Sequence, residues 1–382
     1  MSFDSTDNIA SEDPAKKAAY EAYLQGFQSL LETAPFSLSK FAKDKLLGAV
    51  IKDLHEYHTT QCLAFKHIHQ AIEFSSNSQN DLLLPSIPML AVRLFKQHEL
   101  SSIESEAIFK VLSSSGTSGQ TPARILLDRD TSARQSKVLV NIMQTILGKQ
   151  RLPMLVIDSE SVARGRAGFS ARTAGIQGLS FFGRKHTYAL NEDMIPNWQA
   201  IEAFFAAHGK GPVLIFGFTF MIWQYLIKQA KQDKRQFAAE KALIIHSGGW
   251  KKLEAEKVDN ATFKKACESM IAGSQVHNFY GMAEQVGSIF IECPLGHLHA
   301  PNMAEVLIRR PHNLSLAEHG ETGIIEVLSA LPSSYPGHAI LTEDMGRILG
   351  EDDCPCGWKG KYFEVLGRIP KVEVRGCSDT HG

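Results

Sequence analysis

Hydrophobic positions recur every three to four residues over the first part of the chain, from about residue 14 to residue 74. Leu47, Val50 and Leu54 follow this spacing. Because an α-helix brings residues three and four apart onto one face, the pattern predicts a helical N-terminal region with one buried face. A polar stretch at 75–81 interrupts the pattern.

Continuous apolar runs without a helical period mark the middle of the chain. They cover residues 152–157, 212–216 and 242–246, and each is followed by small or polar residues. Runs of this length, separated by helix-length segments, are typical of strands that are buried on both faces of a largely parallel sheet. We therefore expect an α/β core whose ligands bind at the carboxyl ends of the strands.

The pattern changes again after residue 280, where short strand-like runs alternate with glycine, proline and acidic turns. These runs cover about 323–328, 338–342, 361–366 and 371–374. The expected fold class is α/β, with layered mixed sheets, helices and a β-rich part at about 285–366. We divide the chain into a core of residues 1–366 and a short tail of residues 367–382.

A loop rich in hydroxyls and glycine, at 113–122, lies between the strand-like runs 108–112 and 123–127. Its composition suits a flexible linker, or a loop whose amides and hydroxyls surround an anion such as phosphate. We favour phosphate, since the flanking runs predict a hairpin that holds both ends of the loop. The loop lacks the Gly-Lys-Ser/Thr ending of P-loop enzymes, and no dinucleotide fingerprint occurs at a strand–helix turn.

Composition narrows the function classes. The 382-residue chain has 44% hydrophobic and 21% charged residues and a formal net charge of −1. These values are those of a globular protein, and they do not favour binding to nucleic acid or to an anionic membrane surface. No apolar run is long enough to span a bilayer, and the acidic N-terminus is unlike a signal peptide. We expect a cytoplasmic protein without a membrane span.

The six cysteines are too few and too scattered for a disulfide framework. Cys293 precedes a histidine pair, and Cys354 and Cys356 form a Cys-x-Cys motif further on. Three thiolates and one imidazole are a ligand set for tetrahedral Zn²⁺. The spacing is not that of a standard zinc finger, so the alternative of core or surface thiols stays open.

Other conspicuous residues have ordinary interpretations. Four histidines of the helical region, His55, His58, His67 and His69, lack carboxylates at ligand spacing, and we expect them to be surface and core residues. The phenylalanines at 216–220 could line an acyl channel, but core packing is the favoured interpretation.

Four short motifs occur in a fixed order along the chain. They are the Ser/Gly loop, Ser-Gly-Gly-Trp-Lys at 247–251, Phe-Tyr-Gly-Met-Ala-Glu at 279–284, and Leu-Thr-Glu-Asp at 341–344 followed by Gly-Arg at 367–368. Together they resemble the adenylate-forming superfamily, whose members activate a carboxylic acid with ATP. The resemblance runs from about residue 108 to the end and implies that superfamily's N-terminal core fold.

The resemblance implies a role for each motif. Attack of a carboxylate on the α-phosphate of ATP develops negative charge that must be held from several sides. Glu284 would hold Mg²⁺, a cation that prefers carboxylate oxygen. Taken singly, Glu284 would be a solvated helix end and Asp344 a turn acid. The expected nucleotide-binding residues are Ser114, Ser115, Gly116, Thr117, Ser118, Gly119, Gly248, Gly249, Tyr280, Gly281, Thr342, Asp344 and Arg368.

Within this set, Gly248 and Gly249 would leave room for the adenine and Tyr280 would stack on it. Thr342 or Asp344 would accept hydrogen bonds from ribose hydroxyls.

Typical adenylating enzymes continue after the Gly-Arg motif into a mobile C-terminal domain, which carries a lysine that assists adenylation. Since the sequence ends at Gly382, we expect that domain to be absent. The replacing cation stays open among Lys251, Lys359, Lys361 and Lys371.

The tail carries Cys377 among Lys371, Arg375 and His381, which favour the thiolate form of a cysteine. A thiolate is a suitable nucleophile for an acyl-adenylate, although a lone thiol at this place is more often incidental. This tail, with Tyr-Pro-Gly-His at 335–338, is similar to the acyl-protein synthetase family. That family includes the long-chain fatty acid–protein ligase of bacterial bioluminescence.

This second resemblance implies two steps: ATP and a fatty acid give acyl-AMP, and Cys377 takes the acyl group as a thioester for a partner acyl reductase. The expected catalytic residues are Cys377, Glu284, Thr117 and Lys251. One alternative is an acyl- or aryl-CoA ligase, or a carrier-protein ligase, like the phenylacetate–CoA ligases. Another is a non-catalytic nucleotide-binding scaffold of a reductase complex.

The phenylacetate–CoA-ligase-like enzymes also bear on the cysteines. They show a Leu-His pair similar to the one that ends at His299, so the resemblance implies His299 as the fourth ligand of a structural zinc site with Cys293, Cys354 and Cys356.

Overall fold

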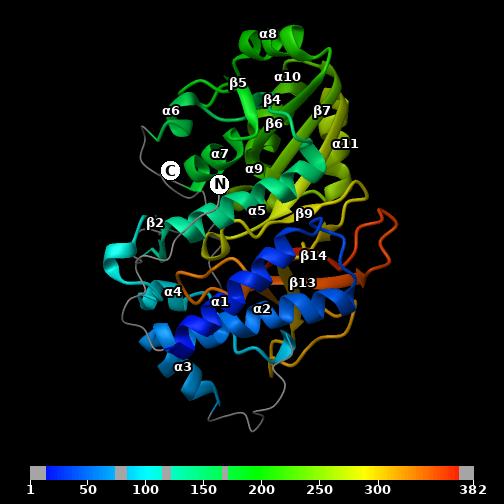
Figure 1. Cartoon of the computed structure of the whole chain (residues 1–382). Coiled ribbons are helices and arrows are strands. Elements are labelled where there is room, and N and C mark those ends of the chain that lie inside the picture. Colours follow the sequence, from blue (N-terminus) through cyan, green and yellow to red (C-terminus); the bar gives the residue numbers. More distant parts are fainter. Residues whose placement is uncertain (1–13, 74–83, 114–121, 166–170, 370–382) are drawn as a thin grey trace.

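The computed structural model describes residues 14–73, 84–113, 122–165 and 171–369 (Figure 1). Three helices occupy the region where the apolar spacing predicts them. They are α1 (Pro14–Leu31), α2 (Lys40–Gln61) and α3 (Leu63–Glu73). The buried face of α2 contains Leu47, Val50 and Leu54, all at most 1% exposed. Burying each such side chain contributes about 1.5–3 kcal/mol, so packing rather than helix propensity holds this region together.

Five parallel strands form the centre of the molecule, and the apolar runs predict three of them, β4, β6 and β7. In chain order they are β4 (Leu152–Val156), β5 (Gly183–Tyr188), β6 (Pro212–Phe218), β7 (Phe237–Ser247) and β8 (Ile271–Tyr280). Their order in the sheet is β5-β4-β6-β7-β8. Since the strands are parallel, their carboxyl ends meet at one edge of the sheet.

Helices pack against this parallel part and connect its strands (upper half of Figure 1). In chain order they are α5 (Arg129–Leu147), α6 (Glu160–Ala163), α7 (Ala171–Ser180), α8 (Trp198–His208), α9 (Thr219–Met221), the π-helical η3 (Ile222–Ile227), α10 (Lys228–Gln232), η4 (Lys251–Glu256) and α11 (Asn260–Met270). Asp128 caps α5, because its carboxylate accepts from the backbone N–H of Thr131 at 2.6 Å.

The β-rich part continues the same sheet with antiparallel strands. They are β9 (Phe290–Glu292), β10 (Leu298–His299), β11 (Ala304–Arg309), β12 (Gly323–Ser329), β13 (Ala339–Glu351) and β14 (Lys361–Arg368). The order from β8 onward is β9-β10-β14-β13-β12-β11, and the short β1 (Leu90–Ala91) pairs parallel with β13. Strand β14 extends to Arg368 and so passes residue 366, the last residue of the core as we divided the sequence.

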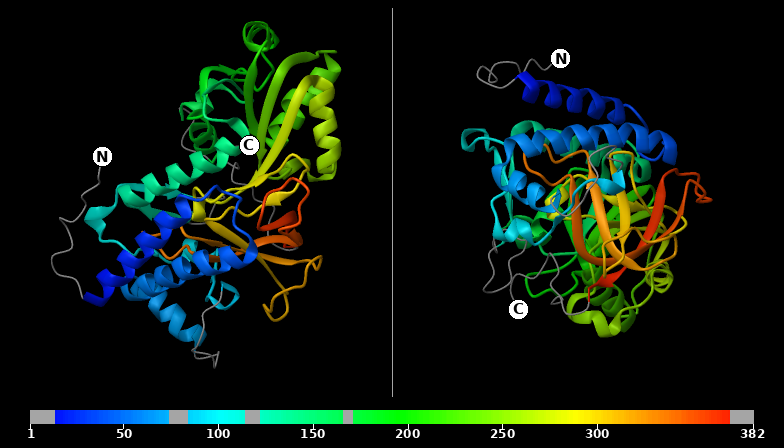
Figure 2. Two further views of the ribbon diagram at one scale, coloured as in Figure 1. Left: turned by 45° about the vertical axis from the view of Figure 1, so that its right-hand side comes forward. Right: turned by 90° about the horizontal axis from the view of Figure 1, so that it is seen from below.

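The predicted hairpin around the Ser/Gly loop is present. Its strands are β2 (Lys110–Ser113) and β3 (Arg124–Leu127), which pair antiparallel from Lys110 opposite Leu127 to Ser113 opposite Arg124. The remaining short elements are η1 (Leu84–Ser86), α4 (Leu94–Gln97), η2 (Ser105–Ala107) and η5 (Ala283–Gln285). Helices α1 and α2 lie side by side on the outside of the β-rich part (Figure 2).

The connection between β12 and β13, residues 330–338, is buried and held from several sides. The Tyr23 hydroxyl donates to the Ala330 carbonyl at 3.1 Å, and the Ser334 hydroxyl donates to the Leu126 carbonyl at 2.8 Å. Arg134 of α5 donates to the Ser333 hydroxyl at 2.7 Å. A buried loop needs partners for its polar groups, and here helices α1 and α5 and strand β3 supply them. We call residues 330–338 the inner connection.

Candidate functional site

Two predicted glycines follow the carboxyl end of β7. Strands β6 and β7 end together, with Phe218 opposite Ser247. Gly248 has φ +81°, a conformation that side chains rarely adopt, and a Cβ there would lie 3.1 Å from the Phe218 ring. A Cβ on Gly249 would have open space around it. Gly248 is therefore required by the backbone, while Gly249 leaves a free surface at the strand ends.

Tyr280, Asp344 and Arg368 come together from three strands. The Tyr280 hydroxyl, at the end of β8, donates to Asp344 Oδ2 at 2.7 Å. Asp344 of β13 lies opposite Arg368 of β14, and Arg368 Nε is 3.8 Å from Asp344 Oδ1. Thr342 is buried, and its hydroxyl donates to the Ile325 carbonyl at 2.7 Å and accepts from the Asp344 N–H at 3.1 Å. Neighbours thus fix the Asp344 carboxylate within β13.

Burial sets the electrostatics of this group. It raises the pKa of Asp344, while the hydrogen bond from Tyr280 and the charge of Arg368 act in the opposite direction. Burial, and then the nearby Asp344 carboxylate, hold the pKa of Tyr280 well above its usual value. The phenol therefore remains a hydrogen-bond donor, and the carboxylate retains acceptor capacity for hydroxyl groups of a ligand.

Glu284 lies in η5, directly after the Tyr-Gly-Met motif, and is 7% exposed. Its backbone carbonyl accepts from the Tyr335 hydroxyl at 2.9 Å. The Gln285 amide donates to the Gly337 carbonyl at 2.8 Å, and a Cβ on Gly337 would lie 2.9 Å from the Glu284 carbonyl oxygen. The inner connection thus packs directly against η5 and sets the position of Glu284.

The charge of Arg368, which lies 3.8 Å from Asp344, also acts on the Glu284 carboxylate. Burial raises its pKa, and a hydrogen bond from its own backbone N–H lowers it. The charges of Lys96 and Arg368 also lower it, whereas the charge of Glu343 raises it. Among the described residues, no side chain forms a hydrogen bond or ion pair with this carboxylate. A buried carboxylate that no described side chain occupies is a suitable ligand for a hard divalent cation such as Mg²⁺.

Several expected site residues fall outside the described structure. Residues 114–121, with Thr117 and the rest of the predicted phosphate loop, are among them, as is Cys377. The backbone of Lys251 begins η4, but its side chain is also outside the description. Their proposed roles stay predictions. Gly281 is described, and a Cβ there would lie 3.3 Å from the Ile289 side chain.

Of the other candidate cations, Lys371 lies outside the described residues, and Lys359 and Lys361 contact groups outside the nucleotide motifs. The Lys359 ammonium donates to the Asp352 carbonyl at 3.1 Å, and Lys361 lies 3.7 Å from the buried Glu305. Lys96 was not among the candidates, because nothing in its local sequence distinguishes it from a surface lysine. Only the fold brings α4 next to β13, through the pairing of β1.

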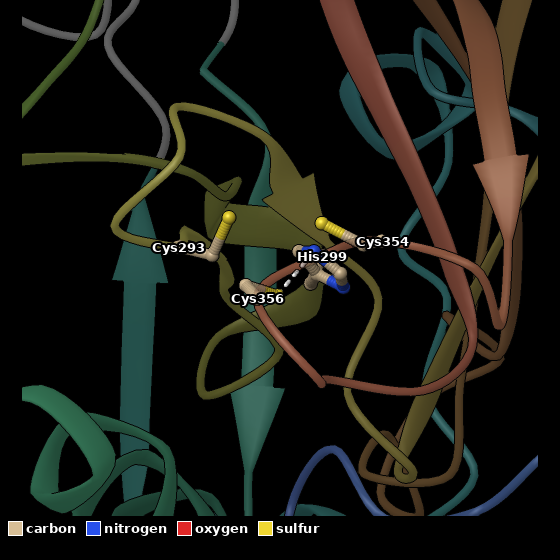
Figure 3. Close-up of side chains that lie close together, drawn as sticks. All are labelled: Cys293, His299, Cys354 and Cys356. Carbon is tan, nitrogen blue, oxygen red and sulfur yellow. Dashed lines mark hydrogen bonds between the residues drawn. The ribbon is translucent and has the colours of Figure 1, made fainter.

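The cysteine and histidine side chains named as zinc ligands lie close together. Cys293 follows β9, His299 is in β10, and Cys354 and Cys356 lie between β13 and β14 (Figure 3). One ligand atom from each of the four lies within 4.8 Å of the others. The His299 Nε2 is 3.5 Å from the Cys356 sulfur.

This donor set fits Zn²⁺. Burial lowers the pKa of His299 to about 4, so its imidazole is neutral and can coordinate a metal. Burial raises the pKa of the Cys293 thiol. Burial also raises the pKa of the Cys356 thiol, to about 12. Grouping thiolates in such surroundings is unfavourable unless a cation compensates their charge, and a bound Zn²⁺ would do so. His297 Nδ1, 3.3 Å from the Cys354 sulfur, supplies a polar contact around the group.

The cluster is attached to the N-terminal helices. Trp358, just after the Cys-x-Cys motif, stacks on Phe36 with ring centroids 4.1 Å apart. The backbone N–H of Lys359 donates to the Phe36 carbonyl at 2.9 Å, and the backbone N–H of Lys40 donates to the Asp352 carboxylate at 2.8 Å. The loop that carries two of the four ligands therefore also holds the connection between α1 and α2.

A histidine network that sequence reasoning treated as ordinary occupies the other side of these helices. His55 of α2 contacts His338 through Nδ1 at 3.0 Å and His69 of α3 through Nε2 at 2.9 Å. His58 bonds the Ser102 hydroxyl at 2.7 Å and donates to the Pro332 carbonyl at 2.9 Å. His55 and His58 are buried in the core, which confirms that part of the expectation. The network itself joins residues that are far apart in sequence, so no local pattern indicates it.

The fold is that of the adenylate-forming ligases. A solved structure of 2-hydroxyisobutyryl-CoA ligase, in an open conformation with 2-HIB-AMP and CoA, superposes with a TM-score of 0.66 at 15% identity, covering 87% of this chain and 71% of that one. The thioesterification state of the same ligase gives a TM-score of 0.64 at 15% identity, covering 88% and 70%.

Sequence comparison places the chain more narrowly. The model of the family described as acyl-protein synthetase, LuxE, matches residues 24–381, so the chain belongs to the acyl-protein synthetase family, a family of ligases. The long-chain-fatty-acid–luciferin-component ligase of Aliivibrio fischeri is 22% identical over 79% of this chain and 79% of its own length. The enzyme of that name from Vibrio harveyi is 20% identical over 87% and 86%.

In the part of the chain that the structure describes, no helix combines the length and the apolar character needed to cross a bilayer.

Proposed function

We propose that this protein joins a long-chain fatty acid to AMP with ATP, and then transfers the acyl group to its own Cys377 as a thioester. Membership of the acyl-protein synthetase family carries the proposal. The names of the two luminescence relatives support a long-chain fatty acid as substrate. The thioester would serve a partner acyl reductase, and the reaction would take place in the cytoplasm.

The geometry at the strand ends suits the first step. The Asp344 carboxylate, held by Tyr280 at 2.7 Å, would accept hydrogen bonds from the ribose hydroxyls. The free surface at Gly249 would take the adenine, and Arg368 would contact ribose or phosphate. Glu284 would hold the Mg²⁺ that accompanies ATP, and that ion would neutralise phosphate charge. The loop at 114–119 would cover the β- and γ-phosphates.

The proposed chemistry has two balanced steps. In the first, a carboxylate oxygen bonds to the α-phosphorus, the bond from that phosphorus to the bridging oxygen breaks, and pyrophosphate leaves. In the second, the Cys377 thiolate attacks the acyl carbon of the mixed anhydride, and AMP leaves with the electron pair. Lys251 and Thr117 would stabilise charge on the phosphates during the first step.

Labelling with radioactive fatty acid tests both steps. Wild-type protein with ATP and magnesium should acquire label that hydroxylamine removes. Cys377→Ala should lose the label but keep fatty-acid-dependent pyrophosphate exchange. Cys62→Ala is the matched control, because Cys62 is a buried thiol, 3% exposed, and should keep both.

Other results would change the assignment. Equal labelling of Cys377→Ala would remove the cysteine from the mechanism. Turnover that requires coenzyme A or a carrier protein would favour a ligase of the phenylacetate–CoA type. ATP binding without any acid-dependent exchange would favour a nucleotide-binding scaffold. The absence of exchange with every fatty acid tried would refute the proposal as a whole.

We also propose that Cys293, His299, Cys354 and Cys356 hold a structural zinc ion. The support is the 4.8 Å grouping of their ligand atoms and the contact of their loop with α1 and α2. Purified protein should contain about one zinc per chain, and Cys354→Ser should lose it together with several degrees of thermal stability. Zinc-free wild-type protein of unchanged thermal midpoint would contradict this assignment.

A further inference from the structure

A positive charge beside Glu284 comes from outside the four nucleotide motifs. Lys96 is a half-buried residue of α4. Of the charges that lower the pKa of Glu284, that of Lys96 acts more strongly than that of Arg368. The Lys96 ammonium therefore lies within electrostatic reach of the buried carboxylate.

Strand pairing holds α4 in this place. Leu90 and Ala91 of β1 pair with Ile340 and Leu341 of β13, and the Val92 N–H donates to the Leu341 carbonyl at 2.9 Å. The chain then turns into α4 immediately beside the residues that precede Asp344. Lys96 is thus brought to the site by backbone hydrogen bonds, which do not depend on its own side chain.

The contacts of Arg93 indicate the direction of Lys96. Arg93 donates to Glu343 Oε1 from Nη2 at 2.7 Å and from Nε at 3.1 Å. The Lys96 N–H bonds to the Arg93 carbonyl at 3.0 Å, which closes a turn between them. Residues three apart on a helical turn share a face, so Lys96 is on the face that Arg93 directs toward Glu343.

The residue before Lys96 anchors α4 to the interior. Phe95 is 2% exposed, and its ring lies edge-on to the Tyr335 ring with centroids 6.1 Å apart. The same tyrosine donates its hydroxyl to the Glu284 carbonyl at 2.9 Å. A single buried ring therefore connects α4 to η5, and the two elements cannot shift independently.

The basic side chains around Glu284 differ in whether they have an acidic partner. Arg93 is paired with Glu343, and Arg368 is 3.8 Å from Asp344. Within the described residues, no carboxylate lies within ion-pair distance of the Lys96 ammonium. Lys96 is thus a cation whose charge is not used by an acidic partner in this part of the protein, next to a carboxylate suited to Mg²⁺.

We infer that Lys96 is a catalytic residue of the proposed adenylation: its ammonium contacts the phosphates of the nucleotide and stabilises charge at the α-phosphate. The inference rests on the proposed function. When a carboxylate oxygen bonds to the α-phosphorus and pyrophosphate departs, the negative charge on the non-bridging and leaving oxygens has to be held. Lys96 supplies a fixed positive charge for this step from the core of the protein, without a proton transfer.

Substitution of Lys96 separates catalysis from folding. Lys96→Met should lower the rate constant of tetradecanoate-dependent pyrophosphate exchange on the order of 100-fold, the usual effect of losing one group that stabilises transition-state charge. The KM for magnesium–ATP should rise several-fold. Lys96→Arg keeps the charge and should retain most of the rate. Lys66→Met, an exposed lysine on α3, removes the same charge and should behave like the wild type.

Calorimetric titration of the same variants with magnesium–ATP, without fatty acid, completes the test. Weaker ATP binding by Lys96→Met than by Lys66→Met supports the contact with phosphate. This result would stand even if no acid supported pyrophosphate exchange by the wild type and the proposed function failed. Unchanged ATP affinity together with an unchanged exchange rate would overturn the role of Lys96 and leave the adenylation proposal intact. Thermal unfolding of each variant shows whether it is folded.

Discussion

Acidification should destabilise the protein through its buried histidines, and His58 allows the effect to be calculated. Burial lowers the pKa of His58 to about 3, against about 6.5 for an exposed histidine. Below pH 6.5 the unfolded chain binds a proton at this residue, whereas the folded protein does not until the pH approaches 3. Stability therefore rises with pH across this window and is lost as the pH falls.

The magnitude follows from these two pKa values. Between pH 7 and pH 5, protonation favours the unfolded chain by about 2 kcal/mol for one such histidine. His55, whose pKa burial also lowers to about 3, adds a similar amount. The network should therefore contribute a loss of about 4 kcal/mol in the free energy of unfolding over two pH units, a large fraction of the stability of an ordinary domain.

Denaturation in guanidinium chloride at pH 7 and pH 5 measures this loss. In His58→Gln the amide can still donate to the Pro332 carbonyl, but it cannot be protonated. The variant should be less stable at pH 7 and should lose about 2 kcal/mol less than the wild type on acidification. His67→Gln, at an exposed position of α3, should lose as much as the wild type. If His58→Gln also loses as much as the wild type, the reasoning from burial is wrong.

Two further substitutions test the contacts of the candidate site. Tyr280→Phe removes the hydrogen-bond donor to Asp344 and so raises the pKa of that carboxyl further. ATP affinity, measured by calorimetry, should fall about tenfold, which is the effect of losing one charge-assisted hydrogen bond. Gly337→Ala introduces a Cβ 2.9 Å from the Glu284 carbonyl and should lower the pyrophosphate exchange rate, whereas Gly178→Ala, where no atom lies within 4 Å, should not. Equal rates in the two alanine variants would contradict the positioning of Glu284 by the inner connection.

Hydrophobic patterns predicted the elements whose stability depends on a single buried face or run. The helices before residue 74 and strands β4, β6 and β7 are of this kind, because the apolar residues within each element indicate which of its faces are buried. The run at 338–342 gave too short a strand. β13 continues to Glu351 through acidic residues and glycines, since β12 and β14 complete its backbone hydrogen bonds on both sides.

The site was predictable where its residues stand in short motifs. Tyr280 and Asp344 were named on this basis, but their direct hydrogen bond joins strands 64 positions apart and has no local signal. The contact of His55 with His338 spans 283 positions, and the place of Lys96 depends on a two-residue strand. Such features arise from tertiary packing, which single-sequence patterns do not contain.

The way the inner connection is enclosed has a practical consequence for dissecting this protein. Its carbonyl groups take donors from Tyr23 and His58, and it is also the support of Glu284. A shortened protein that starts after α2 would leave those carbonyl groups facing a newly exposed apolar surface. Deletion mapping would then score the first two helices as essential for turnover, although they contribute no group to the reacting atoms.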